Sequence, residues 1–207
     1  MADTACRKAT YDDLVAAPEH LVAEIVAGRL YTNPRPSSSH GHAASTLGMD
    51  IGGAFQRGRA GPGGWWIQLE PELHFDEDVL VPDLAGWRRE RMPEIPSVAA
   101  FELAPDWVCE VLSPSTQRLD RVAKMPVYAR VGVGQLWLVD PFQRTLEVFR
   151  REGAHWLLVA THGGEAPLRA EPFEAIELEL EALWLPGVGE PRPLWIPDGP
   201  EPLPLVG

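Results

Sequence analysis

The chain has 207 residues, of which 45% are hydrophobic and 23% are charged; these ordinary globular values exclude a disordered or fibrous class. Its formal net charge is −12, from 18 basic and 30 acidic residues, which argues against broad, non-specific adhesion to DNA or to anionic membranes. Any nucleic-acid substrate would therefore have to be held by a local patch or by a metal ion.

The length of the chain fits one domain and a tail. Residues 1–185 are predicted to form a single domain. Residues 186–207 are predicted to form an extended arm, because they carry seven of the 21 prolines. No apolar run is long enough to span a membrane, and the N-terminal residues lack the apolar core of a signal peptide. We therefore expect a cytoplasmic protein with no membrane partner.

The first elements are a short helix and a hairpin. Thr10 followed by Asp12 and Asp13 is typical of a helix start, and Pro18 marks the end of that helix. The apolar runs 21–26 and 29–31, separated by Ala27-Gly28, predict two paired strands.

A longer helix is predicted after the serine-rich loop at 37–39. Its buried stripe consists of apolar residues at three- and four-residue spacing, namely Ala44, Leu47, Ile51 and Phe55. His40 and His42 fall in its first turn, where a histidine could be a ligand, a substrate contact or a solvated residue. For either histidine alone, the solvated interpretation is favoured.

Strand-like segments follow at residues 65–69, 72–75, 79–81 and 84–87, with a turn at 76–78. Residues 88–106 contain three prolines and are predicted to form a surface excursion with little regular structure, placed where it could overhang a site.

The second half begins with the apolar run 107–112, broken only by Glu110, which is typical of a central strand covered on both faces. Residues 117–131 then have helical periodicity, with Asp120, Lys124 and Tyr128 four apart on one side. Pro126 should bend or split this helix.

Three further strands are predicted after the helix. Residues 135–139 form another buried strand, and 145–149 and 156–160 form an added β-meander. The alternation of apolar residues over 173–180 predicts one more edge strand.

Two acids in apolar surroundings suggest a metal site. Asp83 and Glu110 lie inside or beside strand-like apolar runs, where a carboxylate needs a partner to be tolerated. A bound cation is one such partner. Mg²⁺ usually takes one or two carboxylates and keeps several waters. The backbone carbonyl that follows Glu110, that of Val111, could supply a third protein oxygen.

Lys124 can reach the same place. At about 1.5 Å per residue it lies roughly 12 Å along the helix from the turn at 113–116. Glu110 lies roughly 7 Å back along its strand at about 3.3 Å per residue. Because helical side chains lean toward the N-terminus of their helix, the distance between the Lys124 and Glu110 side chains is shorter than the backbone path. An ammonium there could orient a water, assist its deprotonation or stabilise charge on a phosphate.

Several of these motifs, in this order, resemble one known family. They are Pro82-Asp83, the run 110–116, Lys124, Tyr128, Gly132-Val133 and the run 137–141. Together, over about residues 10–184, they are similar to the Uma-type restriction endonucleases, formerly a domain of unknown function, within the PD-(D/E)XK nuclease superfamily.

The resemblance implies an α/β (α+β) fold with a mixed β-sheet flanked by helices. It also implies Mg²⁺ or Mn²⁺ binding by Asp83 and Glu110, and phosphodiester hydrolysis in nucleic acid, with DNA as the expected substrate. The superfamily's usual lysine, two places after the acid, is replaced by Leu112; the resemblance assigns that role to Lys124. Gln135 stands where many relatives carry an acid and receives no role. A homodimer is expected, since many such nucleases act on two strands.

Simpler alternatives remain open at each position. Asp83 could cap a turn, and Glu110 could form a structural ion pair with Lys124. Glu24 could support the hairpin or touch a metal, and Asp120 could be a solvated helix acid. Besides the endonuclease, we consider a catalytically weak module that keeps the nuclease fold for self-association or for binding another protein. His40, Glu24, Asp120 and Tyr128 are accessory candidates.

Overall fold

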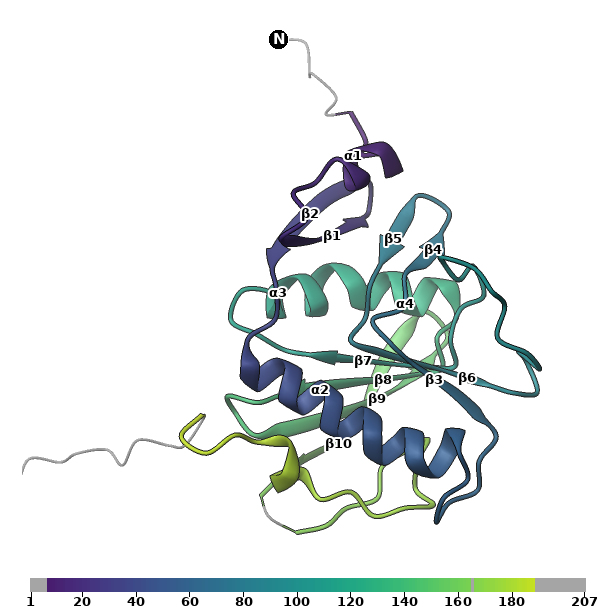
Figure 1. Ribbon diagram of the computed structural model, residues 1–207, viewed down its shortest axis with the longest axis vertical. Helices are drawn as coiled ribbons and strands as arrows, with labels where there is room; N and C mark the ends of the chain where they lie inside the picture. Colours follow the sequence, from purple (N-terminus) through teal and green to yellow (C-terminus); the bar gives the residue numbers. More distant parts are fainter. Residues whose placement is uncertain (1–6, 165, 189–207) are drawn as a thin grey trace, which may run out of the picture.

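The structure, a computed structural model, describes residues 7–164 and 166–188. Within these residues ten strands form two sheets (Figure 1). The strands are β1 (Leu21–Val26), β2 (Arg29–Pro34), β3 (Trp65–Leu69), β4 (Leu73–Phe75), β5 (Asp78–Leu80), β6 (Leu84–Arg88), β7 (Trp107–Val111), β8 (Gln135–Asp140), β9 (Thr145–Glu152) and β10 (His155–Gly163). The helices are α1 (Tyr11–Val15), α2 (Ser38–Ile51), η1 (Gly52–Gln56), α3 (Gln117–Leu119), η2 (Asp120–Lys124), α4 (Met125–Val131) and η3 (Leu180–Leu183).

The larger sheet is mixed. Its strand order is β10-β9-β8-β7-β6-β3. Strands β7 and β8 are parallel, and every other neighbouring pair is antiparallel. A parallel pair requires a crossover, which the helical segment from α3 to α4 supplies. The mixed sheet, the flanking helices and the β8-β9-β10 meander were all predicted, and the α+β fold is confirmed.

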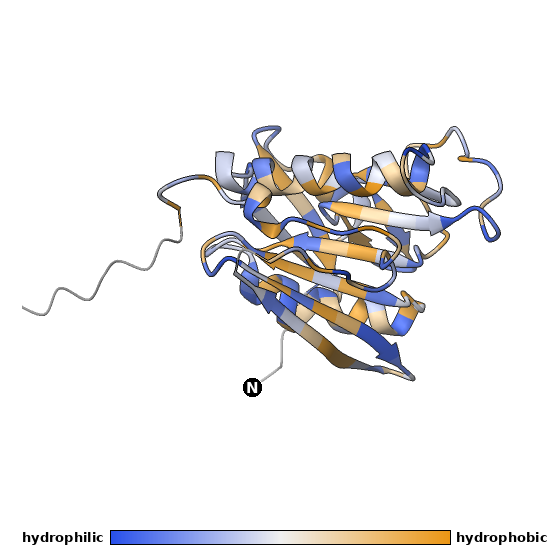
Figure 2. Ribbon diagram, turned by 90° about the horizontal axis from the view of Figure 1, so that it is seen from below, coloured by the Kyte–Doolittle hydropathy of each residue, from blue (hydrophilic) through white to orange (hydrophobic). Residues whose placement is uncertain are grey.

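Helices cover both faces of this sheet (Figure 1). On β7, Trp107, Cys109 and Val111 belong to the core that includes α2, whereas Val108 and Leu112 belong to the core that includes α4. Side chains alternate along a strand, so Glu110 points to the α4 side. Figure 2 shows hydrophobic residues concentrated along the strands, while the helices mix hydrophobic and hydrophilic residues. All five residues of β7 are buried, as predicted for a central strand.

The smaller sheet has the order β2-β1-β5-β4. The predicted turn at 76–78 is shorter than expected, because Asp78 already belongs to β5 and pairs with Phe75. Although β4 and β5 lie between β3 and β6 in sequence, they leave the larger sheet and pair with the N-terminal hairpin. The chain therefore passes from the small sheet back to the large one at residues 81–83.

The helix predicted over residues 117–131 is irregular. The π-helical turn η2 separates α3 from α4, and Pro126 lies in the first turn of α4. Because proline has no N–H, it cannot donate to a preceding carbonyl, which agrees with a distortion at this point. The helix ends at Gly132 in a left-handed conformation.

The edge strand predicted over residues 173–180 is wrong. This segment contains only an isolated bridge between Leu168 and Leu178, followed by the 3₁₀ turn η3. Phe173 is fully buried, and its ring packs against Trp107 and Trp137. Its apolar residues thus cover the α2 side of the large sheet as an irregular segment. Most of the predicted tail, residues 186–207, lies outside the described residues. No helix among the described residues has the length and apolarity needed to cross a membrane.

Candidate metal and catalytic site

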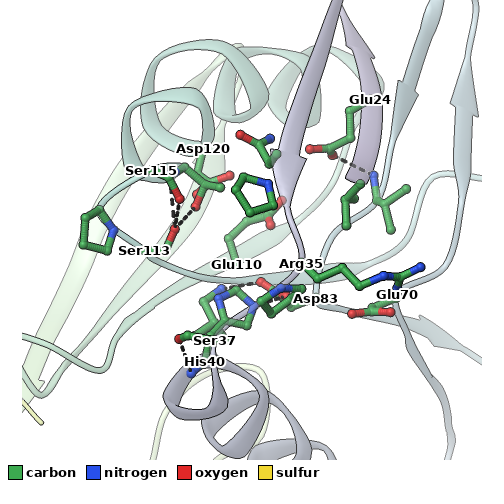
Figure 3. Close-up of a pocket in the computed structure, with 18 of the residues that line it drawn as sticks. Glu24, Arg35, Ser37, His40, Glu70, Asp83, Glu110, Ser113, Ser115 and Asp120 are labelled. Atoms are coloured by element: carbon green, nitrogen blue, oxygen red, sulfur yellow. Dashed lines mark hydrogen bonds and ion pairs between the residues drawn. The ribbon is translucent and has the colours of Figure 1, made fainter. Parts of the chain in front are cut away.

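A pocket of about 250 Å³ opens where the two sheets meet the first turns of α2 and α3. Its walls come from β1, the loop after β2, the start of α2, the segment before β6, the end of β7 and the turn into α3. Figure 3 shows that Glu24, His40, Asp83, Glu110 and Asp120 come from these separate elements to one place. Residues more than 90 positions apart in sequence are thus neighbours.

Asp83 lies between two partners at the end of β6. Its Oδ2 accepts a hydrogen bond from the Val111 backbone N–H at 2.6 Å. Its Oδ1 accepts one from His40 Nε2 at 2.5 Å. His40 is only 8% exposed, so its solvated interpretation is wrong. Burial lowers the pKa of His40, but the hydrogen bond and charge of Asp83 outweigh burial and raise it above its ordinary value.

Lys124 lies in the opposite wall and is only 2% exposed. Its Nζ is 2.8 Å from Glu110 Oε1 and 2.9 Å from Glu24 Oε1. Asp120 Oδ1 is 3.7 Å away, one helical turn earlier. The predicted reach of Lys124 to Glu110 is therefore observed, and it takes the form of an ion pair. Burial lowers the pKa of Lys124, but Glu110 and Glu24 raise it well above its ordinary value.

Tyr128 lies behind Glu110, beneath the pocket wall rather than in its lining. Its hydroxyl donates to Glu110 Oε1 at 2.5 Å, and the residue is fully buried. Asp120, Lys124 and Tyr128 are spaced four apart and remain on one side of the helix despite the π-helical turn. All three are buried on the side that faces β7. Asp120 is 4% exposed, so the alternative of a solvated helix acid is wrong.

The pocket carries an excess of negative charge. Four buried or half-buried carboxylates, those of Glu24, Asp83, Glu110 and Asp120, face one buried lysine and one buried histidine, while the exposed Glu70 and Arg35 add one charge of each sign. Burial raises the pKa of Glu110 well above its ordinary value; Lys124 opposes this shift, while Asp120 and Asp83 add to it. Burial likewise raises the pKa of Asp120 to about 6, against the effect of Lys124. Additional positive charge here would relieve this excess.

The donor set suits a hard divalent cation better than zinc. Among the described residues, no three His, Cys, Asp or Glu side chains are grouped closely enough to hold a metal by themselves. A cation here would use Asp83, Glu110, backbone oxygen and water, which is the ordinary pattern for Mg²⁺. The N–H and C=O of one strand residue point to the same side. Since the Val111 N–H points at Asp83, its carbonyl also lies on the Asp83 side. These residues therefore fit the ion.

Comparison with known proteins shows the family and the fold of this chain. The family model Uma2, described as "Putative restriction endonuclease", matches residues 9–182. The chain belongs to the Uma2 family. A crystal structure described as a putative nuclease belonging to DUF820, from Anabaena variabilis ATCC 29413, is 22% identical, with a TM-score of 0.66. The similarity covers 84% of this chain and 97% of that one, and it shows a shared fold. A search of curated proteins found no match.

Sequence reasoning missed some features of this Uma2-family pocket. Arg35 lines it from the loop after β2, and its Nη2 donates to the Glu19 carbonyl. The only sequence signal was its place in the motif Pro34-Arg35-Pro36, in a loop before a predicted helix. Glu24 was predicted as an alternative ligand, but not as a partner of Lys124.

The excursion at 88–106 does not overhang the site, and that expectation was wrong. None of its residues lines the pocket. Instead it packs on the strands of both sheets: Trp87 Nε1 donates to the Leu103 carbonyl, and the His74 N–H donates to the Phe101 carbonyl.

Proposed function

We propose that this protein is an endonuclease, dependent on Mg²⁺ or Mn²⁺, that hydrolyses phosphodiester bonds in nucleic acid, with DNA as the expected substrate. The observation that carries the proposal is the buried Lys124 ammonium against Glu110, beside Asp83, in one open pocket. The printed descriptions of the family and of the Anabaena structure, a restriction endonuclease and a nuclease, support the same reaction class.

In this proposal Asp83, Glu110 and the Val111 carbonyl are the metal ligands. Each carboxylate keeps acceptor capacity besides its present hydrogen bonds, since two oxygens offer about four lone-pair positions. The cation, when bound, would polarise the phosphodiester and make an attacking water more acidic. Its charge would also offset the excess of carboxylates around Lys124.

The other residues hold these groups in position. His40 and the Val111 N–H fix the two oxygens of Asp83. The Tyr128 hydroxyl donates to Glu110 Oε1, and Lys124 forms an ion pair with the same oxygen. Lys124 is then the catalytic cation: its ammonium lies where it could stabilise charge that develops on the phosphate or orient the attacking water. Glu24 and Asp120 keep Lys124 protonated and directed toward the pocket.

Metal binding is tested by thermal melting with and without Mg²⁺ or Mn²⁺. A ligand that binds only the folded state stabilises it by about 2.7 kcal/mol at 100 times its Kd. The wild-type protein should therefore melt at higher temperature in metal, and Asp83→Asn should lose this shift. Asp12→Asn, at an exposed position on α1, is the control and should retain it.

Activity is tested by plasmid cleavage with the same proteins. We expect metal-dependent nicking or linearisation by the wild type and by Asp12→Asn, and a loss of at least 100-fold in Asp83→Asn and Lys124→Met. Equal cleavage by the wild type and Asp83→Asn would refute the assignment of the site. No cleavage by the wild type with either metal would refute the reaction.

We also propose that the protein forms a homodimer through β10. This strand ends the larger sheet, and among residues 7–164 and 166–188 it pairs only with β9, so no described strand lies at its outer edge. Leu157, Leu158 and Val159 are each more than 40% exposed. The strand contains no Asp, Glu, Lys or Arg, so two copies of this strongly acidic chain could approach there without direct repulsion. Antiparallel pairing of two β10 strands would satisfy both edges.

A further inference from the structure

A second cavity, of about 480 Å³, lies between the α2-η1 helix and the edge strand β3. We call it the α2-β3 groove. Its charged lining consists of Arg57 and Arg59, and no carboxylate lines it. Gln56 and Ser45 are its other polar side chains. For a chain with a net charge of −12, a cavity lined only by positive charge is a marked local exception.

The two arginines of the groove are available to a ligand. Both are exposed, and in the described part of the chain neither guanidinium has a hydrogen-bond or ion-pair partner. By contrast, the nearby Arg89 is engaged, since it donates to the Gln56 carbonyl at 2.8 Å. An unpaired guanidinium beside a cavity is suited to bind phosphate, to which it can donate two parallel hydrogen bonds.

Glycines on the helical side of the groove leave the backbone accessible to a ligand. A Cβ placed on Gly52 or Gly53 would meet no atom within 4 Å, so a ligand can approach the helix closely there. Gly48 differs, because a Cβ on it would lie 3.1 Å from Leu69 and Leu84 side-chain atoms. The rims are apolar, since Met49 is 68% and Leu69 is 60% exposed. Such surfaces can contact sugars and bases between phosphates.

The groove and the acidic pocket share two structural elements. Leu69 lines the groove and the next residue, Glu70, lines the pocket. Helix α2 links them as well, with His40 in the pocket at its start and Gly52 in the groove just after its end. Twelve residues of helix rise about 18 Å. That length matches about five nucleotides of one DNA strand at roughly 3.4 Å each.

We propose that the α2-β3 groove binds the sugar-phosphate backbone of the nucleic acid on one side of the bond held in the acidic pocket, with Arg57 and Arg59 contacting its phosphates. The inference rests on the proposed function and identifies where the substrate is held. The pocket itself repels phosphate, because acids outnumber its cations. The groove provides the local basic patch that so acidic a chain needs. An acidic protein segment fits this track less well, because helix α2 carries residues of both the groove and the pocket proposed to cleave phosphodiesters.

The first test is binding of fluorescently labelled 20-nucleotide DNA, single-stranded and duplex, measured by anisotropy in EDTA to prevent cleavage. We expect the double variant Arg57→Gln/Arg59→Gln to bind roughly tenfold more weakly at low salt. Loss of two phosphate contacts should also reduce the slope of log K against log salt by about 1.4 to 1.8. The control Arg29→Gln/Arg169→Gln changes the net charge equally at exposed positions away from the groove and should bind like the wild type.

A second pair of variants leaves both arginines intact. Gly53→Glu adds a negative charge where the structure has room for a side chain, whereas Gly53→Gln adds a side chain of the same length without charge. We expect Gly53→Glu to weaken binding several-fold more than Gly53→Gln. Thermal melting checks that all four variants are folded, so that lost binding is not caused by unfolding.

The outcomes separate the two proposals. Suppose that the wild type cleaves DNA while the arginine and Gly53→Glu variants bind DNA like their controls. DNA binding by the groove is then refuted, and the proposed nuclease activity is supported. If the wild type binds DNA through the arginines but cleaves with neither metal, the groove stands and the reaction is refuted. If the wild type binds neither single-stranded nor duplex DNA, the groove proposal fails.

Discussion

Lys124 is the residue on which the electrostatics of the pocket depend. It is almost fully buried and within 3 Å of both Glu24 and Glu110. Removing one member of a buried ion pair costs more than the pair contributes, because the remaining charge loses its partner. Here a single lysine is shared by two close carboxylates, and a third lies 3.7 Å away. The structural and catalytic interpretations of Lys124 are therefore compatible.

Lys124→Met should lower the free energy of unfolding by roughly 3–5 kcal/mol at pH 8. At pH 5 the loss should be smaller, because burial raises the pKa of Glu110 and its protonation removes an unpaired charge. Chemical denaturation at the two pH values measures this difference. The neighbouring Arg121→Met is the control: Arg121 pairs with Glu147 at 2.7 Å but is 38% exposed, so its loss should cost less than about 1 kcal/mol. Equal losses in the two variants would contradict the buried ion pair.

Asp120 gives a prediction of pH dependence. Burial raises its pKa from 3.8 to about 6, although Lys124 opposes the shift. Between about pH 4 and pH 6 the folded chain therefore binds more protons at Asp120 than the unfolded chain, so this group makes stability fall as the pH rises through that window. The cost is at most about 3 kcal/mol above pH 6, at about 1.4 kcal/mol per pKa unit.

Asp120→Asn should remove this cost. In EDTA the variant should match the wild type near pH 4 and become more stable by roughly 1–3 kcal/mol above pH 6. Unfolding by urea across pH 4–8 measures the difference. The control Asp12→Asn changes the net charge equally from an exposed position. A constant difference between Asp120→Asn and the wild type at every pH would show that Asp120 does not titrate in this window.

At the scale of the elements, the local patterns were predicted well and the long-range pairings were not. The hairpin, helix α2, strand β7 and the meander follow from periodicity and turn residues. Asp83, Glu110 and Lys124 were predicted to lie together from the strand-turn-helix spacing and from the family resemblance, and all three line one pocket. By contrast, nothing local distinguishes β4 and β5, which join the small sheet, from β3 and β6, which stay in the large one.

The same limit explains the missed contacts of the pocket. Glu24 meets Lys124 only because the small sheet docks against the helix, and the two residues lie 100 positions apart. The alternation over 173–180 reflects packing of Phe173 on tryptophans rather than strand pairing. Apolar periodicity reports which residues are buried, and it cannot tell a strand edge from an irregular segment that covers a sheet.

Glu24 holds the segment that runs from the small sheet to the large one, which can be tested by comparing two substitutions. Its Oε1 accepts from the Val81 N–H at 2.8 Å and lies 2.9 Å from Lys124 Nζ. Both Glu24→Gln and Glu24→Ala remove the charge, but Glu24→Gln retains the acceptor for the Val81 N–H. Glu24→Ala should therefore cost about 1–3 kcal/mol more than Glu24→Gln. If both variants are equally stable in urea unfolding, the hydrogen bond does not hold this segment.

At the scale of the whole molecule, charge is divided unevenly. Acids are concentrated in the pocket between the sheets, the α2-β3 groove is basic, and β10 carries no carboxylate or basic residue other than its histidines. In a chain with a net charge of −12, the neutral edge is the surface least protected against self-association by repulsion. The proposed site thus lies toward one side of the large sheet. The proposed dimer contact lies at β10, the edge strand opposite to β3.

A charge placed on β10 should dissociate the dimer. We expect the wild type to have the mass of two chains in light scattering after size exclusion, and Leu158→Lys to have the mass of one, because a lysine at the paired edge would be desolvated beside its copy. Val15→Lys is the control: Val15 is an exposed apolar residue on α1, so the variant gains the same charge away from β10 and should remain dimeric. Both variants should retain wild-type stability to within about 0.5 kcal/mol, as surface substitutions usually do. A monomeric wild type at micromolar concentration, or a dimeric Leu158→Lys, would exclude β10 as the interface.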